Sequence, residues 1–176
     1  MNKKLKLWEL DRVSEEEFKQ QQKFPIIIVL NDIRSLTNVG TFFRTSDAFN
    51  VQKIYLCGIT ATPPHREIQK TALGATETVC WEHRENIIEL IDELKDNNVK
   101  ICSIEQTEET LMLQDVRNLP KETYALVFGN EVNGVDQNVI NASDQIIEIP
   151  QFGTKHSLNV SVCAGIVIWE FAKNNM

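Results

Sequence analysis

The sequence has no long hydrophobic run, few histidines and no closely paired cysteines. No window approaches the roughly 18 apolar residues of a membrane span, and residues 1–10 lack the apolar stretch of a secretory signal. The three histidines lie far from the cysteines, which leaves no metal site with ligand-like spacing. We therefore expect a cytoplasmic protein with no membrane contact and no metal. The cysteines, expected to be free and buried, are Cys57, Cys80, Cys102 and Cys163.

The motifs of several common enzyme classes are also absent. No Gly-x-Gly-x-x-Gly follows the first apolar segment, so the dinucleotide-binding fingerprint is missing. Gly129 and Gly134 have P-loop spacing, but Val135-Asp136 stands where that motif requires Lys-Ser/Thr. Ser157 lacks the Gly-x-Ser-x-Gly elbow of a hydrolase.

An excess of positive charge is lacking as well. The 176 residues contain 18 Lys and Arg against 25 Asp and Glu, and the net charge is −7. This balance argues against a protein that coats nucleic acid non-specifically, but it leaves room for a local basic patch.

The sequence does show a regular alternation of short apolar segments and helical patterns. Because the apolar segments are continuous rather than alternating, they predict strands that are covered on both faces. The fold class expected is therefore α/β, a mostly parallel sheet with helices on both faces. We expect residues 1–24 to form a short helical extension and residues 25–176 to form one domain. The expected strands are 26–30, 53–57, 77–81, 100–104, 124–128 and 146–149, and the expected helices are 14–22, 39–49, 66–73, 86–97, 135–141 and 159–173.

Three polar segments lie where such a fold holds ligands. They are 38–44, 129–131 and 150–161, which follow or precede predicted strands and helices. Strand ends and helix N-termini present free N–H groups, so one composite site is expected. Its glycine, asparagine and serine content suits a neutral or zwitterionic cofactor together with a hydroxylated, phosphate-bearing substrate.

These segments resemble the SpoU (TrmH-type) branch of the SPOUT methyltransferases. The matching blocks are 38–49, which contains Asn-x-Gly-x-x-x-Arg, then 126–135, and finally Ile149-Pro150 with 157–162. The resemblance implies transfer of a methyl group from S-adenosylmethionine to a ribose 2′-hydroxyl of tRNA or rRNA, with S-adenosylhomocysteine as product. It also implies a deep C-terminal trefoil knot and a homodimer that is formed through the knot region and the last helix.

By the same resemblance, Arg44 activates the ribose hydroxyl. Because an arginine essentially keeps its proton in proteins, we expect its guanidinium to stabilise the developing alkoxide instead of acting as a base. Asn38 and Glu131 would orient this group, and Ser157 and Asn159 would face it. Each residue also has a simple structural alternative. Arg44 would form an ion pair on the helix surface, Asn38 would stabilise a turn, and Glu131 would be an ordinary acidic residue of a loop. Ser157 and Asn159 would cap a helix.

The resemblance also assigns residues to the cofactor and to the RNA. tRNA is the expected target, with rRNA as the alternative. A non-catalytic RNA-binding or assembly protein and a base methyltransferase are the other readings. The implied cofactor residues are Leu126, Val127, Phe128, Gly129, Asn130, Ile149, Gln151, Ser157 and Leu158. The RNA-phosphate candidates, each equally compatible with a solvated surface charge, are Arg34, Arg44, Arg66, Lys155 and His156.

Overall fold

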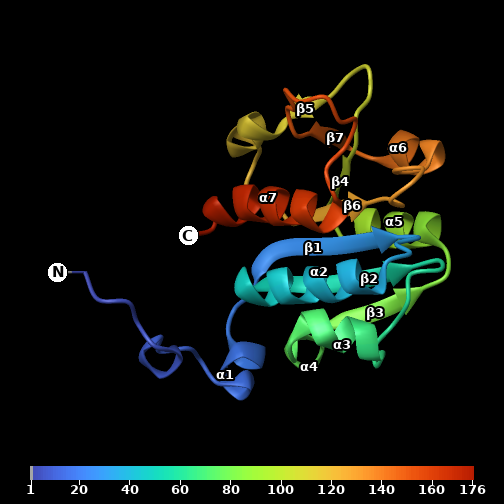
Figure 1. The fold of residues 1–176 in the computed structure, drawn as a ribbon. Coiled ribbons are helices and arrows are strands. Elements are labelled where there is room, and N and C mark those ends of the chain that lie inside the picture. Colours follow the sequence, from blue (N-terminus) through green and yellow to red (C-terminus); the bar gives the residue numbers. More distant parts are fainter. Residues whose placement is uncertain (1) are drawn as a thin grey trace.

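A seven-stranded sheet organises the computed structural model, which describes residues 2–176 (Figure 1). The strands are β1 (Phe24–Asn31), β2 (Val51–Cys57), β3 (Trp81–Arg84), β4 (Lys100–Ile104), β5 (Leu111–Met112), β6 (Tyr124–Phe128) and β7 (Gln145–Glu148). Their order is β3-β2-β1-β6-β4-β7-β5, and every pair of neighbours is parallel. The predicted parallel sheet is confirmed.

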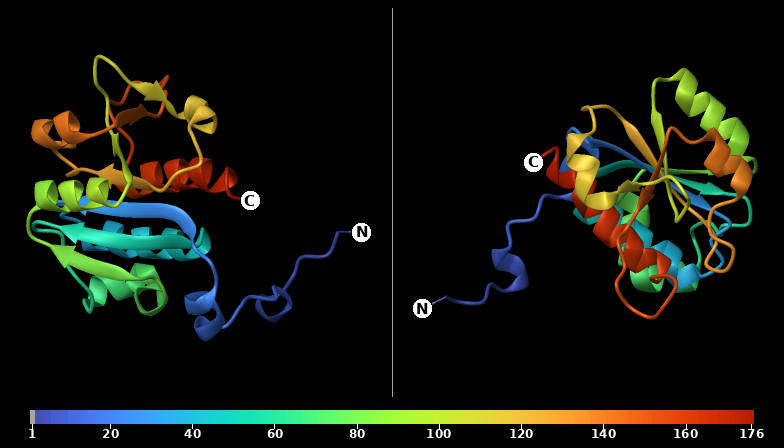
Figure 2. Two further views of the ribbon diagram at one scale, coloured as in Figure 1. Left: turned by 180° about the vertical axis from the view of Figure 1, so that it is seen from behind. Right: turned by 90° about the horizontal axis from the view of Figure 1, so that it is seen from above.

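Helices cover both faces of this sheet, as the view from above in Figure 2 shows. The helices are α1 (Glu15–Gln20), α2 (Leu36–Ala48), α3 (Arg66–Ala72), α4 (Ala75–Thr78), α5 (Ile87–Asp96), α6 (Gln137–Ala142) and α7 (Val160–Lys173), with 3-10 helices η1 (Leu7–Glu9) and η2 (Leu113–Asn118). Along β1, Ile28 and Leu30 face the core with α2 and α7, whereas Ile27 and Val29 face the core with α5 and α6. Successive strand residues point to opposite faces, so each strand serves two cores and reads as a continuous apolar run.

The later strands are inserted between earlier ones. β6 lies between β1 and β4, and β7 lies between β4 and β5. The chain therefore returns twice to gaps that were left open by preceding strands, and it ends in α7 on the face that carries α2. The knot that the resemblance implies stays a prediction.

Local capping explains where several helices begin. The Ser14 hydroxyl accepts from the Glu17 amide, and the Glu17 carboxylate accepts from the Ser14 amide, so a capping box begins α1 at the predicted position. α2 begins at Leu36, three residues earlier than predicted, because the Ser35 hydroxyl accepts from the Asn38 amide. Among residues 2–176, no helix combines the length and the apolar character that crossing a membrane requires.

The strand predicted at 77–81 is wrong. Residues 75–78 form α4, and β3 starts only at Trp81. Leu73 and Gly74 both have left-handed backbone conformations, with φ of 50° and 91°, and they turn the chain directly from α3 into α4. The Thr78 hydroxyl then donates to the Asp47 carboxylate of α2, which fixes the short helix against the core. The sequence analysis also did not anticipate β5 or η2.

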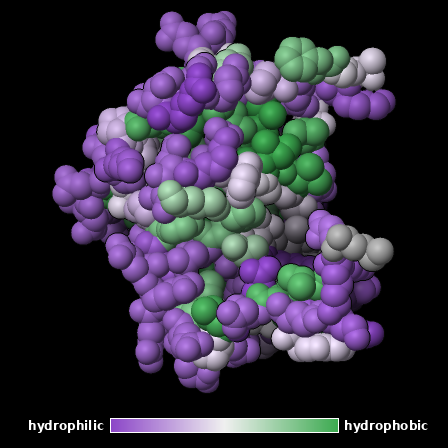
Figure 3. All heavy atoms as spheres, turned by 90° about the vertical axis from the view of Figure 1, so that its left-hand side faces the viewer, coloured by the Kyte–Doolittle hydropathy of each residue, from purple (hydrophilic) through white to green (hydrophobic). Residues whose placement is uncertain are grey.

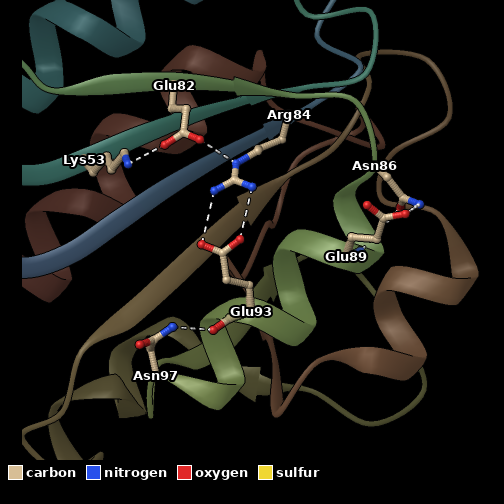
Figure 4. Close-up of polar contacts among 7 residues, drawn as sticks. All are labelled: Lys53, Glu82, Arg84, Asn86, Glu89, Glu93 and Asn97. Atoms are coloured by element: carbon tan, nitrogen blue, oxygen red, sulfur yellow. Dashed lines mark hydrogen bonds and ion pairs between the residues drawn. The ribbon is translucent and has the colours of Figure 1, made fainter.

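Edge strand β3 is joined to β2 and α5 by a surface ion-pair network (Figure 4). Glu82 lies 2.7 Å from the Lys53 ammonium and also pairs with Arg84, whose guanidinium reaches Glu93 of α5 at 3.1 Å. The hydrogen bond from Lys53 is the main cause of the lowered pKa of the Glu82 carboxyl. All four side chains are partly exposed, so each pair contributes about 1 kcal/mol or less.

Three of the four cysteines are inert thiols. Desolvation raises the pKa of Cys57, Cys102 and Cys163 to about 12, so these thiols stay protonated at neutral pH. No disulfide joins any cysteine within the described residues 2–176. Cys80 is exposed, between α4 and β3, so the expectation of burial is wrong for this residue.

Gly40 sets how closely α2 approaches α3. A Cβ at Gly40 would collide with the Thr71 hydroxyl and the Ile68 carbonyl oxygen of α3. A Cβ on Gly165 of α7, in contrast, would meet no atom within 4 Å among residues 2–176 beyond its chain neighbours and the adjacent backbone of α7. Substitution by alanine can therefore be compared at two helical glycines, of which Gly40 is closely packed against another helix and Gly165 is not.

We expect Gly40→Ala to lower the free energy of unfolding by about 1–3 kcal/mol, because the added methyl group overpacks the α2–α3 contact. In the single chain, Gly165→Ala should raise it by roughly 0.5–1 kcal/mol through helix propensity, so the comparison is made at a protein concentration at which the chain is monomeric. Urea denaturation at one fixed protein concentration measures both. A neutral Gly40→Ala would contradict the close approach of α2 and α3.

Candidate functional site

A cleft of about 730 Å³ opens at the carboxyl ends of β4, β6 and β7. Its volume lies within the range of small-molecule sites, and its position is the one where parallel sheets bind ligands. The loops after these three strands supply most of its lining. The lining residues that the sequence analysis assigned are Phe128, Gly129, Asn130, Glu131, Ile149, Gln151, His156, Ser157, Leu158 and Asn159.

One carboxylate ties the β6–α6 loop to the start of α2. Glu131 accepts hydrogen bonds from the Arg34 amide at 2.9 Å, the Ser35 amide at 3.0 Å and the Asn38 side chain at 3.0 Å. Partial burial raises the pKa of the Glu131 carboxyl, but the three hydrogen bonds outweigh it, so the pKa is lowered overall. Glu131 is therefore an ionised acceptor at neutral pH.

Asn38 extends this contact to the C-terminal helix. Its side chain is buried, and its carbonyl oxygen accepts from the Asn159 amide nitrogen at 3.4 Å. The Asn159 oxygen caps α7 by accepting from the Ser161 and Val162 amides. Asn159 thus performs the helix-capping role, which was the structural alternative considered for it, and it also contacts Asn38.

Two further contacts hold the β6–α6 loop in shape. The Asn130 side chain donates to the Asp32 carbonyl at 2.7 Å, at the end of β1. At the other end of the loop, the Glu105 carboxylate accepts from the Val135 amide at 2.9 Å. Gly134 has a φ of 69°, and a Cβ there would collide with the Glu105 carboxylate. The loop is therefore fixed on both sides before any ligand binds.

Comparisons with known proteins identify the family. A model of the SpoU rRNA Methylase family matches residues 25–169. The chain belongs to this family. It is 32% identical over 146 residues to the 23S rRNA (guanosine-2'-O-)-methyltransferase RlmB of Neisseria meningitidis. The aligned region covers 83% of this chain and 57% of that protein. The chain thus spans less than two thirds of the length of this curated relative.

Solved structures agree with the SpoU assignment. The A. aeolicus TrmH/SpoU tRNA modifying enzyme superposes with a TM-score of 0.79 at 25% identity, over 92% of this chain and 80% of that chain. AviRb from Streptomyces viridochromogenes, solved in complex with AdoMet, gives a TM-score of 0.77 at 17% identity, over 90% of this chain and 64% of that chain. The AviRb similarity establishes the fold alone.

Not every residue that the SpoU resemblance assigned to the cofactor lines the cleft. Leu126 and Val127 are fully buried in the middle of β6, where Leu126 packs toward α2 and α7, and Val127 packs toward α5 and α6. The expectation that Leu126 and Val127 contact a ligand in the cleft directly is therefore corrected. Both residues support the strand, and the lining of the cleft begins at Phe128. Strand residues ahead of the carboxyl end are enclosed by both helical layers.

Arg44 lies apart from the other assigned SpoU motif residues. It is exposed on α2 and lines a second hollow, of about 630 Å³, together with residues 11–15 and 72–75. Arg44 does not belong to the lining of the cleft, whereas Asn38, six residues earlier on α2, binds Glu131. Within one chain, the expected meeting of Arg44 with Ser157 and Asn159 is not found.

The other RNA candidates are distributed around these two regions. Arg34, Arg66, Lys155 and His156 are all exposed. Arg34 adjoins Glu131 through its backbone, and His156 lines the cleft, while Arg66 begins α3 and Lys155 lies in the loop before α7. Of these four residues, His156 is therefore the one that lines the cleft.

The sequence analysis did not identify the part of the cleft lining that lies at the end of β4. Ile104, Glu105, Gln106 and Thr107 line the cleft, and Glu148 at the end of β7 lines it as well. The rule that parallel strands present ligands at their carboxyl ends would have identified Glu105, because it directly follows β4. Within residues 2–176 the His, Cys, Asp and Glu side chains form no group of three suited to a metal ion.

We expect Glu131→Gln to destabilise the protein at pH 7, because an amide cannot accept all three hydrogen bonds. The pKa of Glu131 is lowered in the folded state, so its contribution is complete above the ordinary value of 4.5 and is lost as the pH falls below it. Denaturant unfolding of the wild type and the variant should therefore converge in acid. Glu85→Gln, which alters an exposed carboxylate, is the control, and a pH-independent difference would contradict the role of the Glu131 charge.

Proposed function

We propose that the protein is an S-adenosylmethionine-dependent methyltransferase that acts on a ribose 2′-hydroxyl of RNA. The observation that carries the proposal is the Glu131–Asn38–Asn159 hydrogen-bond chain at the mouth of a cofactor-sized cleft. Membership of the SpoU family supports it, and so does the cofactor complex of AviRb, whose fold is the same. A non-catalytic RNA-binding role is disfavoured because the motif residues are present and three of them are joined.

The chemistry of the cleft fits the cofactor. Phe128, Ile149 and Leu158 supply apolar surface for the adenine, and the loop backbones supply hydrogen-bonding groups. Glu105 and Glu148 belong to the lining of the cleft, and no Lys or Arg does among the described residues. An anionic wall suits S-adenosylmethionine, which supplies an electrophilic methyl group on a positively charged sulfonium.

Arg44 would act on the ribose. Its guanidinium stabilises the negative charge that develops on the 2′-oxygen as the hydroxyl loses its proton, and it binds an adjacent phosphate through its paired N–H groups. Because the methyl group leaves a sulfonium, the reaction neutralises charge, and a site from which water is excluded favours it. The proton passes to phosphate, water or Glu131.

A homodimer would bring Arg44 to a cleft. Val162, Ile166 and Trp169 lie on one side of α7 and are 54%, 40% and 45% exposed. Figure 3 shows apolar residues exposed among polar ones on the face toward which the C-terminal end of α7 points. We infer that α7 packs against a second copy, and that Arg44 of one protomer serves the cleft of its partner.

tRNA is the proposed target, and rRNA is the alternative. The A. aeolicus structure is of a tRNA modifying enzyme, and the meningococcal relative is a 23S rRNA methyltransferase. Ribose methylation maps of a deletion strain and its parent distinguish the two, because the lost 2′-O-methyl group marks the target.

We expect Arg44→Ala to reduce methyl transfer by about 100-fold or more, since a group that stabilises transition-state charge is removed. Binding of S-adenosylmethionine, measured by calorimetry, should stay unchanged. Arg117→Ala on η2 is the matched arginine control. Mass spectrometry of digested RNA should place the methyl group on ribose. The proposal fails if the wild type binds no cofactor and methylates no RNA.

A mixing experiment tests the shared site. Arg44→Ala and Glu131→Gln chains are each expected to be weakly active, whereas heterodimers combine an intact cleft with an intact Arg44 from the other chain. Co-expressed variants should therefore exceed the sum of their separate activities. If heterodimers form and activity does not rise, Arg44 serves the cleft of its own chain.

A further inference from the structure

The loop between β7 and α7 presents one aromatic side chain entirely to solvent. Phe152 is 97% exposed, more than any other large apolar residue in the described part of the chain. Its neighbours Gly153, Thr154 and Lys155 are exposed as well. A phenyl ring left in water forgoes the favourable free energy of its burial, so a ring held in this way is suited to a partner that covers it.

The base of the same loop is anchored at the cleft. Gln151, His156, Ser157 and Leu158 line the cleft, and the Gln106 side chain donates to the His156 carbonyl at 3.4 Å. The loop thus leaves the cleft at Gln151 and returns at His156, with Phe152 beside the point of departure. Phe152 is therefore the direct neighbour of a residue that lines the cleft.

The charge of the loop differs from that of the protein. The chain carries a net charge of −7, yet residues 150–159 contain Lys155 and His156 and no acid. This loop therefore suits a ligand that is a polyanion and contains flat rings, because its positive charge attracts the anion and its aromatic side chain can stack on a ring. Base–aromatic stacking is the usual way in which proteins bind unpaired nucleotides, and it tolerates every base.

We propose that Phe152 stacks on an unpaired base of the RNA next to the nucleotide that enters the cleft, with Lys155 beside the flanking phosphate. The proposal rests on the proposed function and extends it to the form of the substrate, which is a single-stranded or loop segment. RNA is favoured over a second copy of the chain because the ring adjoins the cleft, where the accepting ribose must arrive.

The test compares Phe152→Ala, Phe152→Leu and Phe152→Trp, with unfractionated tRNA from a strain that lacks the gene as the probe. Phe152→Ala should weaken tRNA binding and raise KM roughly 5- to 100-fold, the range that the loss of one stacked base gives. The value of kcat should change little, because the contact precedes the reaction. Phe152→Leu should resemble Ala, and Phe152→Trp should retain wild-type affinity, because stacking requires an aromatic face.

Three controls separate stacking from other causes. Affinity for S-adenosylmethionine should be the same in all variants, and Ile59→Ala, another exposed apolar residue, should leave tRNA binding unchanged. Wild-type tRNA affinity in Phe152→Ala would overturn the proposal. Dissociation of the dimer by Phe152→Ala in sedimentation velocity would also overturn it, because Phe152 would then contact a second copy. If the wild type binds tRNA but transfers no methyl group, the proposed function fails, while filter binding still decides whether Phe152 stacks.

Discussion

The Glu131 carboxylate is the interaction on which the geometry of the cleft depends. It joins the loop after β6 to the segment that begins α2, and through Asn38 it reaches Asn159 at the start of α7. These three segments are distant in sequence, and no direct backbone pairing holds them together at this point. An ionised acceptor can satisfy several N–H groups at once, which makes this single side chain an effective junction.

The sheet makes that junction possible. β1 and β6 are parallel neighbours with Leu30 opposite Phe128, so the loops that follow them emerge side by side. Asn130 then reaches back to the Asp32 carbonyl, and Glu131 reaches the amides of residues 34 and 35. Because both strands end at the same edge, short side chains suffice to connect loops that are separated by about a hundred residues of chain.

Charge is divided between the cleft and its rim. Glu105, Glu131 and Glu148 line the cleft, whereas the loop before α7 carries Lys155 and His156. This division matches the two molecules that the proposed reaction brings together, a cationic methyl donor and an anionic RNA. The overall negative charge therefore does not oppose RNA recognition, because the contacts that matter are local and close to the site.

The sequence by itself determined the features that depend on near neighbours. The continuous apolar run of β1 predicted a buried strand, and Ser14 and Asn159 predicted helix starts. Local signals failed at 77–81, where the turn at Leu73-Gly74 and the contact of Thr78 with Asp47 produce a helix. Only the tertiary structure decided that Asn38, Glu131 and Asn159 meet, while Leu126 is enclosed and Arg44 lies in a separate hollow. The physical reason is that strand order and helix rotation set which side chains share a space, and neither is encoded within a single motif.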